Sequence, residues 1–315
     1  MIRIAEYDDV DPLQVLHLNL MCLGFALTPE LVALIRRMDP RPFPCFALYA
    51  QVGATVAGQV GVFRLPVVSV AGAAEVGGIW AVATHPEYQQ RGVATQLLAA
   101  AHARMRAAGL RFSTLGTDRY RVAHALYRQQ GYSDLHSPAI VVGRSDALPD
   151  RPEIRAEPAG ADRLDLADRL FERSAAGRLG FARRHTPFFA FLHARRYLDA
   201  QALWLLWRDN ELIGYAAATA RGSLLEVTNL LLTDATAATA ATKALARAAK
   251  TQYVCARLDQ ADDIQAFAQA GFHLANQGWG TFMAKPLTAD ATPAEFSQLY
   301  GLEEGRFLLS FMDVT

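Results

Sequence analysis

The sequence contains few cysteines and no pattern typical of a metal site. Its three cysteines, Cys22, Cys45 and Cys255, lie far apart in a chain of 315 residues, and an odd number of distant cysteines does not form a disulfide framework. The eight histidines also lack the spacing of metal ligands, since His185 and His193 are too far apart to form a helical pair. We therefore expect no metal, and the unpaired cysteines indicate a reducing, cytoplasmic compartment.

The sequence also lacks an excess of either charge and a clear membrane segment. Its 31 basic and 31 acidic residues balance, whereas general nucleic-acid binders normally carry a basic excess. The N-terminal stretch MIRIAEYDDVD has early acids and no apolar core of a signal peptide. Residues 43–63 are uncharged and long enough to cross a bilayer, but glutamines, a proline and glycines interrupt them. We expect two strands there, and neither a membrane nor a nucleic acid as partner.

Strand and helix patterns alternate along both halves of the chain. In the first half, strand patterns cover 1–7, 45–52, 54–65, 74–84, 111–117 and 139–145, and helix patterns cover 12–23, 29–38, 93–108 and 122–130. A segment rich in proline and charge follows, with a boundary near Pro149–Pro152. We therefore expect an α/β protein with two domains, at residues 1–148 and 153–315.

The second half repeats the order of the first at a distance of about 150 residues. EIRAE at 153–157 matches IRIAE near the start, and the pair at 202–220, turning at Asp209-Asn210, matches the pair at 45–64. LLEVTNLLLTD at 224–234 corresponds to GGIWAVATHP in the first half, and QAFAQAGFHL at 265–274 corresponds to ALYRQQGYSDL. The sequence therefore predicts two copies of one fold.

The stretch HPEYQQRGVATQLL, residues 85–98, places a glycine turn directly before a helix. The first amides of a helix lack partners within the helix and, with the helix dipole, form an anion site. Gly92 and Ala94 leave room for a phosphate, and Arg91 adds a positive charge. Neither a Walker-type loop nor a GxGxxG turn after the first strand occurs in the sequence. By itself, the turn fits a pyrophosphate site and an ordinary strand-to-helix turn equally well.

With its surroundings, the turn resembles the Q/R-x-x-G-x-G/A signature of the GNAT superfamily of acyl-CoA-dependent N-acetyltransferases. Gln89, Gly92 and Ala94 match the signature, and the resemblance covers residues 1–145, including IWAVATHPEY and ALYRQQGY. The arrangement is similar to the mycothiol-synthase and enhanced-intracellular-survival types, which join two such units. The resemblance implies an α/β fold of the α+β type: two tandem GNAT-like units, each a mixed, mainly antiparallel twisted sheet flanked by helices.

The resemblance also implies which residues bind acetyl-CoA. In the family, amides of the turn hold the CoA pyrophosphate, the preceding strand pairs with the pantetheine arm through its backbone, and a short helix lies by the thiol. Tyr120 stands where many relatives carry asparagine. This difference argues against a polar contact from that position, but it does not affect the expected binding of the cofactor. The matching positions are Gln90, Arg91, Gly92, Val93, Ala94 and Thr95 for the turn, Val82, Ala83 and Thr84 for the strand, and Val122 and Ala123 for the helix.

Tyr127 is the candidate catalytic residue. The family pattern assigns protonation of the leaving thiolate to the tyrosine four residues before a Gly-aromatic pair, here Gly131-Tyr132. A phenol with a pKa near 10 can serve as a general acid, although a ring packed in the core is the structural alternative. In the second copy, Phe267 holds the equivalent place, and LLLTDATAATAATKAL runs into its helix without glycine or arginine. We therefore assign the acetyl-CoA site to the first copy and a structural, substrate-shaping role to the second.

The general base stays open between Glu75, His85 and ordered water, and Asp118 and His124 flank the next strand end. The expected function is direct acetyl transfer from acetyl-CoA to an unidentified primary amine, with strand amides near Val82 polarising the thioester carbonyl. The alternative is a non-catalytic, acyl-CoA-binding sensor. A small-molecule amine is the favoured acceptor, while a protein acceptor and homo-oligomer formation stay open.

Overall fold

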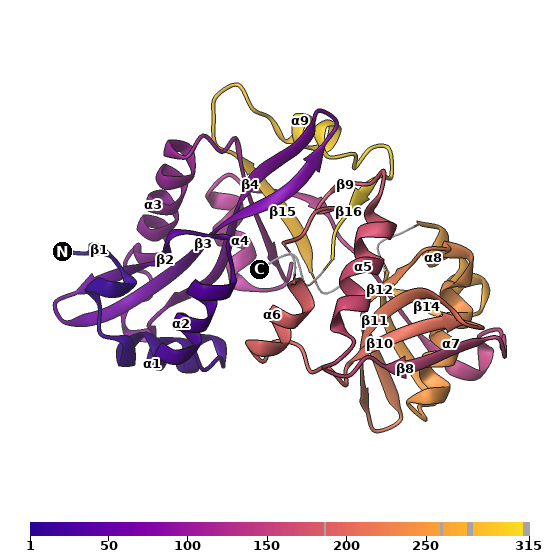
Figure 1. Cartoon of the computed structure of the whole chain (residues 1–315). Coiled ribbons are helices and arrows are strands. Elements are labelled where there is room, and N and C mark those ends of the chain that lie inside the picture. Colours follow the sequence, from indigo (N-terminus) through magenta and orange to yellow (C-terminus); the bar gives the residue numbers. More distant parts are fainter. Residues whose placement is uncertain (186, 259–260, 276–279, 311–315) are drawn as a thin grey trace. The chain divides into compact units, whose positions relative to one another are not determined.

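The computed structural model describes residues 1–185, 187–258, 261–275 and 280–310. The chain forms two compact units, drawn in Figure 1 with colours that follow the sequence. Unit 1 comprises Met1–Leu135 and Phe282–Glu303. Unit 2 comprises His136–Thr281 and residues 304–310 of the described chain. The predicted two-unit α/β architecture is therefore confirmed, with one mixed sheet and flanking helices in each unit.

The sheet of unit 1 has the strand order β1-β2-β3-β4-β5-β15-β6. Neighbours from β1 to β4 are antiparallel, and β4 pairs with β5 in parallel. In Figure 1, α3 lies on one side of β2 and β3, and α1 and α2 lie on the other. The strands are β1 (Arg3–Glu6), β2 (Pro42–Val52), β3 (Thr55–Ser69), β4 (Gly72–Thr84), β5 (Phe112–Thr117), β6 (Ser133–His136) and β15 (Thr281–Pro286). The helices are α1 (Pro12–Leu23), α2 (Pro29–Met38), α3 (Val93–Ala107), α4 (Val122–Gln129) and α9 (Pro293–Leu299), with the 3₁₀ turns η1 (Tyr7–Asp9) and η2 (Pro86–Tyr88).

Local sequence signals explain where the first helices begin and end. Asp11 caps α1 by accepting a hydrogen bond from the Leu13 N–H at 2.9 Å, and Thr28 caps α2 in the same way. A proline at the first position of each helix has no amide to leave unpaired. Gly24, in the left-handed conformation, ends α1. Both predicted helices are thus confirmed at their predicted bounds.

The sheet of unit 2 has the order β14-β7-β13-β12-β11-β10-β8. Its strands are β7 (Ala139–Arg144), β8 (Ile154–Pro158), β10 (Leu203–Arg208), β11 (Glu211–Arg221), β12 (Leu224–Leu232), β13 (Tyr253–Leu258) and β14 (His273–Ala275). Strand β9 (Leu179–Gly180) pairs in parallel with β16 (Phe307–Leu308). The helices are α5 (Leu164–Ala175), α6 (Phe188–Ala194), α7 (Ala238–Ala248) and α8 (Ala261–Gln269), with η3 (Ser145–Ala147) and η4 (Ala235–Ala237).

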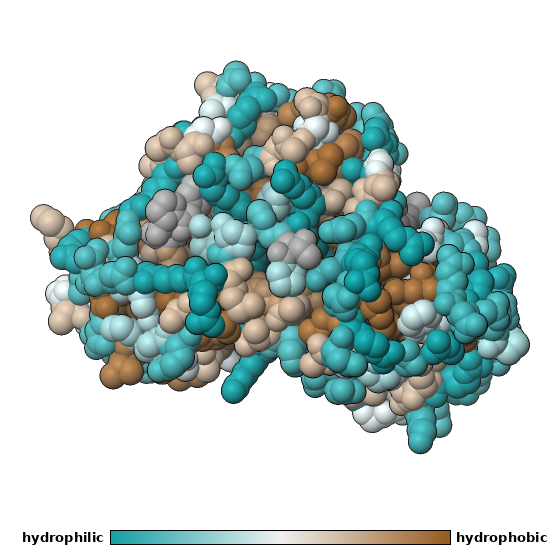
Figure 2. All heavy atoms as spheres, in the orientation of Figure 1, coloured by the Kyte–Doolittle hydropathy of each residue, from teal (hydrophilic) through white to brown (hydrophobic). Residues whose placement is uncertain are grey.

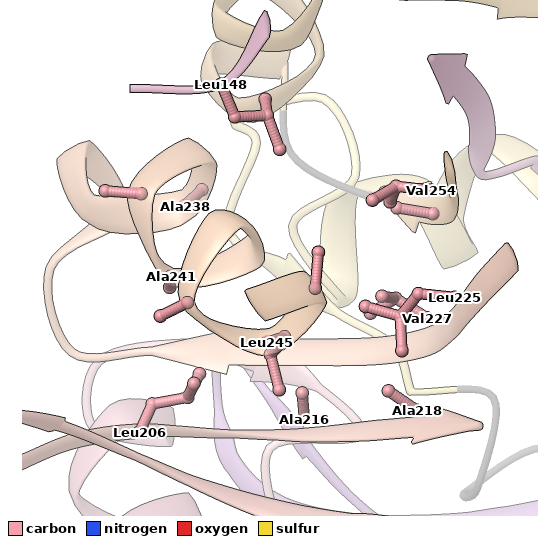
Figure 3. Close-up of a cluster of buried hydrophobic side chains, with 14 of the residues drawn as sticks. Leu148, Leu206, Ala216, Ala218, Leu225, Val227, Ala238, Ala241, Leu245 and Val254 are labelled. Atoms are coloured by element: carbon pink, nitrogen blue, oxygen red, sulfur yellow. The ribbon is translucent and has the colours of Figure 1, made fainter. Parts of the chain in front are cut away.

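The core of unit 2 is built on an alanine-rich helix. Figure 3 shows Ala238, Ala241 and Leu245 of α7 above buried side chains of the sheet, including Ala216 and Val227. Small side chains let the helix approach the strands closely, so dispersion contacts are dense despite little side-chain volume. The helix within LLLTDATAATAATKAL therefore packs its alanine side chains against the sheet of unit 2.

In each sheet, a strand from the other half of the chain lies between two strands of that unit. In unit 1, β15 lies between β5 and β6, and at the same place in unit 2, β7 lies between β13 and β14. The register of β7 with β13 runs from Ala139↔Leu258 to Arg144↔Tyr253. The compact units therefore do not coincide with the predicted division at 148 and 153, because inter-strand hydrogen bonds assign β7 to the second sheet. A helix-and-strand pattern does not encode such an exchange.

The uncharged stretch 43–63 is divided between β2 and β3, as predicted. Among the described residues, no helix has the length and apolar character needed to cross a membrane. Hydrophilic and hydrophobic side chains are intermixed on the face of the molecule shown in Figure 2.

Three buried polar side chains support the core of unit 1 beside α3. The Tyr132 hydroxyl lies 2.8 Å from Nε2 of His102 and 2.6 Å from Oγ of Ser113, and all three residues are buried. Burial, together with the nearby charges of Lys285 and Arg106, lowers the pKa of His102 to about 3. The imidazole is therefore neutral in the folded chain, although an unfolded histidine takes up a proton near pH 6.5.

We predict that His102 makes unit 1 acid-sensitive. Its stabilising effect is complete above pH 6.5 and is lost as the pH falls toward 3, because only the unfolded state gains the proton in that window. The free energy of unfolding should fall by about 5 kcal/mol across the window, which spans about 3.5 pKa units. Denaturant titrations at several pH values should show a weaker pH dependence for His102→Gln. His17→Gln, at an exposed histidine, is the control. Identical slopes for His102→Gln and wild type would contradict the prediction.

Candidate functional site

The turn between β4 and α3 contains two left-handed residues. Gln90 has φ 58° and Gly92 has φ 75°, and Gly92 is the N-cap of α3 without a side-chain capping bond. The first amides of α3 therefore receive no cap from the N-cap side chain, which is the geometry of a helix that can bind an anion. Arg91 is exposed, with its guanidinium carbon 5.4 Å from the centroid of the Tyr88 ring. Of the other predicted turn residues, Gln90 and Thr95 are exposed, Ala94 is half-buried and Val93 is buried.

Close packing holds the start of α3 against the sheet. A Cβ atom at Gly58 would lie 2.7 Å from Cγ1 of Val93 and 2.8 Å from the carbonyl oxygen of Ala83. The His85 N–H donates to the Ala57 carbonyl at 2.9 Å. The position of the turn is therefore fixed by β3 as well as by the strand from which the turn emerges.

Strand β4 carries a β-bulge and separates from β5. Its register with β3 passes from Gln59↔Ala83 to Gly61↔Trp80, so β4 has one extra residue, and Ala81 there has φ 47°. Its parallel register with β5 covers Gly77↔Ser113 and Gly78↔Thr114 only. A bulge bends a strand and increases its twist. The predicted pantetheine-binding residues 82–84 thus follow the bulge, outside this register, with Val82 and Thr84 half-buried and Ala83 buried.

Two buried side-chain amides behind the bulge were not identified from the sequence. Nε2 of Gln59 donates to the Ala81 carbonyl at 3.1 Å, and Gln59 also forms a reciprocal pair with Asn19 of α1. The available signal was a polar residue in each of two apolar patterns, Gln59 in TVAGQVGVF and Asn19 in LHLNLMCL. Such a residue is buried only when it finds hydrogen-bond partners, but the sequence does not name the partner.

Tyr127 lies on α4 with its ring packed in the core and its hydroxyl without a hydrogen bond from any described residue. The residue is 7% exposed, and its ring meets Tyr132 edge-on at 5.9 Å. Burial raises the pKa of Tyr127 to about 12, so the phenol keeps its proton at neutral pH. In contrast, the Tyr132 hydroxyl is bound on two sides.

The other predicted residues of α4 differ in their surroundings. Val122, the first residue of the helix, is 90% exposed. Ala123 is half-buried and packs against the core cluster that contains Tyr127. Tyr120, at the position where relatives carry asparagine, is 76% exposed.

The candidate bases have other interactions. Glu75 accepts a hydrogen bond from Arg64 at 2.8 Å, and at about 3.3 Å per residue it lies roughly 23 Å along β4 from Val82. Nε2 of His124 lies 2.9 Å from Asp134. Both arrangements are those of structural ion-pairing or hydrogen-bonding groups.

The remaining two candidates lie in turns. Nδ1 of His85 accepts the Glu87 N–H at 3.3 Å, and the His85 ring lies 5.6 Å from Tyr88, beside the turn. Asp118 accepts the Tyr120 N–H at 2.9 Å. These contacts assign no base, so water stays among the alternatives.

Unit 2 repeats the frame of this site with different chemistry. Phe267 is fully buried and meets Phe272 edge-on at 5.1 Å, and the Phe272 N–H donates to the Phe267 carbonyl at 3.1 Å, as Tyr132 does to Tyr127. The equivalent of the Tyr127 ring is present without its hydroxyl.

The helix start in unit 2 carries its own carboxylate. Asp234 caps η4, just before α7, by accepting the Thr236 N–H at 3.0 Å, and its other oxygen accepts from Arg208 at 2.8 Å. Hydrogen bonds from Thr236 and Arg208 lower the pKa of Asp234, so it is ionised at neutral pH. Unit 2 thus has a negative side chain and a 3₁₀ turn directly before its helix, where unit 1 has Gly92 directly before α3.

Unit 2 also contains a separate cavity of about 350 Å³ between α5 and residues 182–185. Asp168 lines it and is buried, with Oδ2 unpartnered among the described residues. Burial raises the pKa of Asp168 to about 6. None of the predicted acetyl-CoA residues lines this cavity.

Comparisons with known proteins agree with this geometry. Residues 13–132 match the model of the "Acetyltransferase (GNAT) family", whereas no curated protein matches the sequence at a significant level. A GCN5-related N-acetyltransferase from Anabaena variabilis superposes with a TM-score of 0.67 at 17% identity, over 91% of this chain and 73% of that one. A probable N-acyltransferase from Enterococcus faecalis gives 0.69 at 14% identity, over 91% and 73%.

Eis1 from Mycobacterium abscessus is also similar, with a TM-score of 0.63 at 13% identity, over 92% of this chain and 74% of that one. These likenesses span both units, and at such low identity they establish the fold. The family model covers the turn, the bulge and Tyr127. Residues 13–132 are therefore a GNAT-family acetyltransferase domain, in a chain that has the fold of the GCN5-related N-acetyltransferases.

Proposed function

We propose that unit 1 transfers an acetyl group directly from acetyl-CoA to a primary amine. The observation that carries this proposal is the difference between two similar units. Unit 1 has Gly92 directly before α3 and a tyrosine at position 127, whereas unit 2 has Asp234 at the turn before its helix and Phe267 at the place of Tyr127.

The turn residues would hold the CoA pyrophosphate. The amides of Val93, Ala94 and Thr95 begin α3, and Gly92 leaves open space beside them, because a Cβ there would meet only Gln96, at 3.9 Å. Arg91 adds an exposed positive charge. Backbone groups of residues 82–84 would pair with the pantetheine arm, and Val122 and Ala123 would lie by the thiol.

The proposed chemistry is a single displacement. The amine nitrogen attacks the thioester carbonyl carbon, a C–N bond forms, and the C–S bond breaks. The Val82 N–H stabilises the negative charge that develops on the carbonyl oxygen. Tyr127 gives its phenolic proton to the departing sulfur, and the proton released by the amine restores the phenol through water.

Unit 2 would be a non-catalytic partner of this site. Its ionised Asp234 at the helix start opposes a phosphate, and Phe267 has no proton to give. We propose a small-molecule amine acceptor and a cytoplasmic location, with a protein amine and a homo-oligomer as alternatives.

The function is tested by measuring free thiol released from acetyl-CoA across a panel of primary amines. Amine-dependent release supports the enzyme. Tight CoA binding without release for any amine would instead favour the acyl-CoA-binding sensor, and absence of CoA binding by calorimetry would overturn both.

We predict that Gly92→Ala weakens CoA binding at least tenfold. The left-handed φ of 75° strains a side chain, and the added methyl group crowds the phosphate. Gly109→Ala is a matched control, because Gly109 follows the other end of α3 with φ 77° and nothing within 4 Å. Both variants should lose about 1 kcal/mol of stability. Calorimetry that finds equal CoA affinity for the two variants would count against the turn as the pyrophosphate site.

We predict that Tyr127→Phe lowers turnover at least tenfold and leaves acetyl-CoA affinity nearly unchanged. Its folding stability should change little, because the hydroxyl has no hydrogen bond to a described residue. The control Tyr132→Phe should lower folding stability rather than turnover. It should lose about 1–3 kcal/mol of stability because His102 and Ser113 lose a buried partner. Turnover of Tyr127→Phe equal to wild type would refute the acid assignment.

A further inference from the structure

The bulge in β4 is held by a closed network of two buried side-chain amides. Asn19 and Gln59 are 0% and 2% exposed. Nδ2 of Asn19 donates to the Val15 carbonyl and to Oε1 of Gln59, both at 2.8 Å. Nε2 of Gln59 donates to Oδ1 of Asn19 at 2.9 Å and to the Ala81 carbonyl at 3.1 Å.

This network has only one consistent orientation. The two backbone carbonyls accept hydrogen bonds, so each amide must present its nitrogen to one of them, and the two remaining contacts then pair a nitrogen with an oxygen. All four amide protons are used. A fully satisfied buried network keeps its members in place, since any rotation would leave a donor or acceptor unpaired in the core.

The network fixes a peptide plane. The Ala81 carbonyl and the Val82 N–H belong to the same planar trans peptide unit and point in opposite directions. Because Gln59 holds the carbonyl on its own side, the Val82 N–H must point away from Gln59. The left-handed φ of 47° at Ala81, which non-glycine residues rarely adopt, is maintained by the same contact.

We propose that Asn19 and Gln59 are positioning residues that hold the Ala81–Val82 peptide so that its N–H receives the thioester carbonyl oxygen. This role rests on the proposed function. Neither side chain touches the reacting atoms. They act through the backbone, and the predicted effect is therefore on turnover more than on binding of acetyl-CoA.

Unit 2 provides an internal comparison. Strand β12 also has a bulge, where its register with β11 passes from Ala217↔Asn229 to Ala218↔Val227. There the Thr228 hydroxyl donates to the Ala217 carbonyl at 3.2 Å, and no residue of β12 has a positive φ. Counted from the matching pairs Gly58↔Thr84 and Gly214↔Leu232, β11 has Tyr215 where β3 has Gln59. A bulge can therefore form without a pair of side-chain amides. The Asn19–Gln59 pair is found in unit 1, where the bulge residue Ala81 has a left-handed φ and where the candidate acid Tyr127 lies.

The test uses the double variant Asn19→Leu/Gln59→Met in the full-length chain. Replacing both partners with apolar side chains of similar size removes the network without leaving one amide unpaired against the other. We expect kcat to fall at least tenfold, while the KM for the amine and the Kd for acetyl-CoA change less than threefold. Gln59→Met alone should show the same split and provides the measurement if the double variant does not fold.

Thr114→Val is the matched control. The buried Thr114 hydroxyl donates at 2.9 Å to the Gly77 carbonyl, also on β4 but before the bulge, so its loss tests a similar buried contact away from Val82. Its kcat should stay within twofold of wild type. The positioning role is overturned if wild type is active and the Gln59 variants keep its kcat, or if Thr114→Val loses as much as they do. Absence of amine-dependent thiol release by wild type would instead overturn the proposed function itself.

Discussion

The separation of β4 from β5 is the constraint on which the candidate site of unit 1 depends. Two parallel register pairs, Gly77↔Ser113 and Gly78↔Thr114, join the strands. The bulge at Ala81 then redirects β4. Backbone groups after the bulge become available to a ligand only because the strand no longer pairs with β5 there. The turn follows directly from this strand, so the direction of β4 sets where the turn lies. The packing of Val93 against Gly58 then holds the start of α3 against β3.

Two hydrogen-bonded groups of buried polar side chains in unit 1 lie near the predicted site residues. Asn19 and Gln59 lie behind the bulge. His102 and Ser113 contact the hydroxyl of Tyr132, whose ring meets Tyr127 edge-on. Burying such groups is costly unless every donor and acceptor is satisfied, and in exchange a satisfied network permits few alternative conformations. Rigid polar supports of this kind are what a site needs to orient one backbone amide and one phenol.

The two units share their strand order and aromatic packing but differ in the side chains at the candidate site. The edge-on pairs Tyr127–Tyr132 and Phe267–Phe272 have the same backbone hydrogen bond, and each sheet receives its strand β7 or β15 at the same place. Aromatic packing can therefore keep the helix in place without the hydroxyl. Asp234, which caps the 3₁₀ turn directly before α7, places a negative charge near the helix start of unit 2.

The sequence by itself predicted the two copies, most element bounds, the turn with Gly92 and the position of Tyr127. These features follow from local rules, because caps, hydrophobic periods and a glycine before a helix act over a few residues. The tertiary structure alone decided that β7 and β15 exchange sheets, since pairing between distant strands depends on edges that no local pattern describes. It also decided the partners of Gln59, which include Asn19, forty residues away. A buried side-chain amide requires hydrogen-bond partners, and only the folded chain determines which groups those partners are.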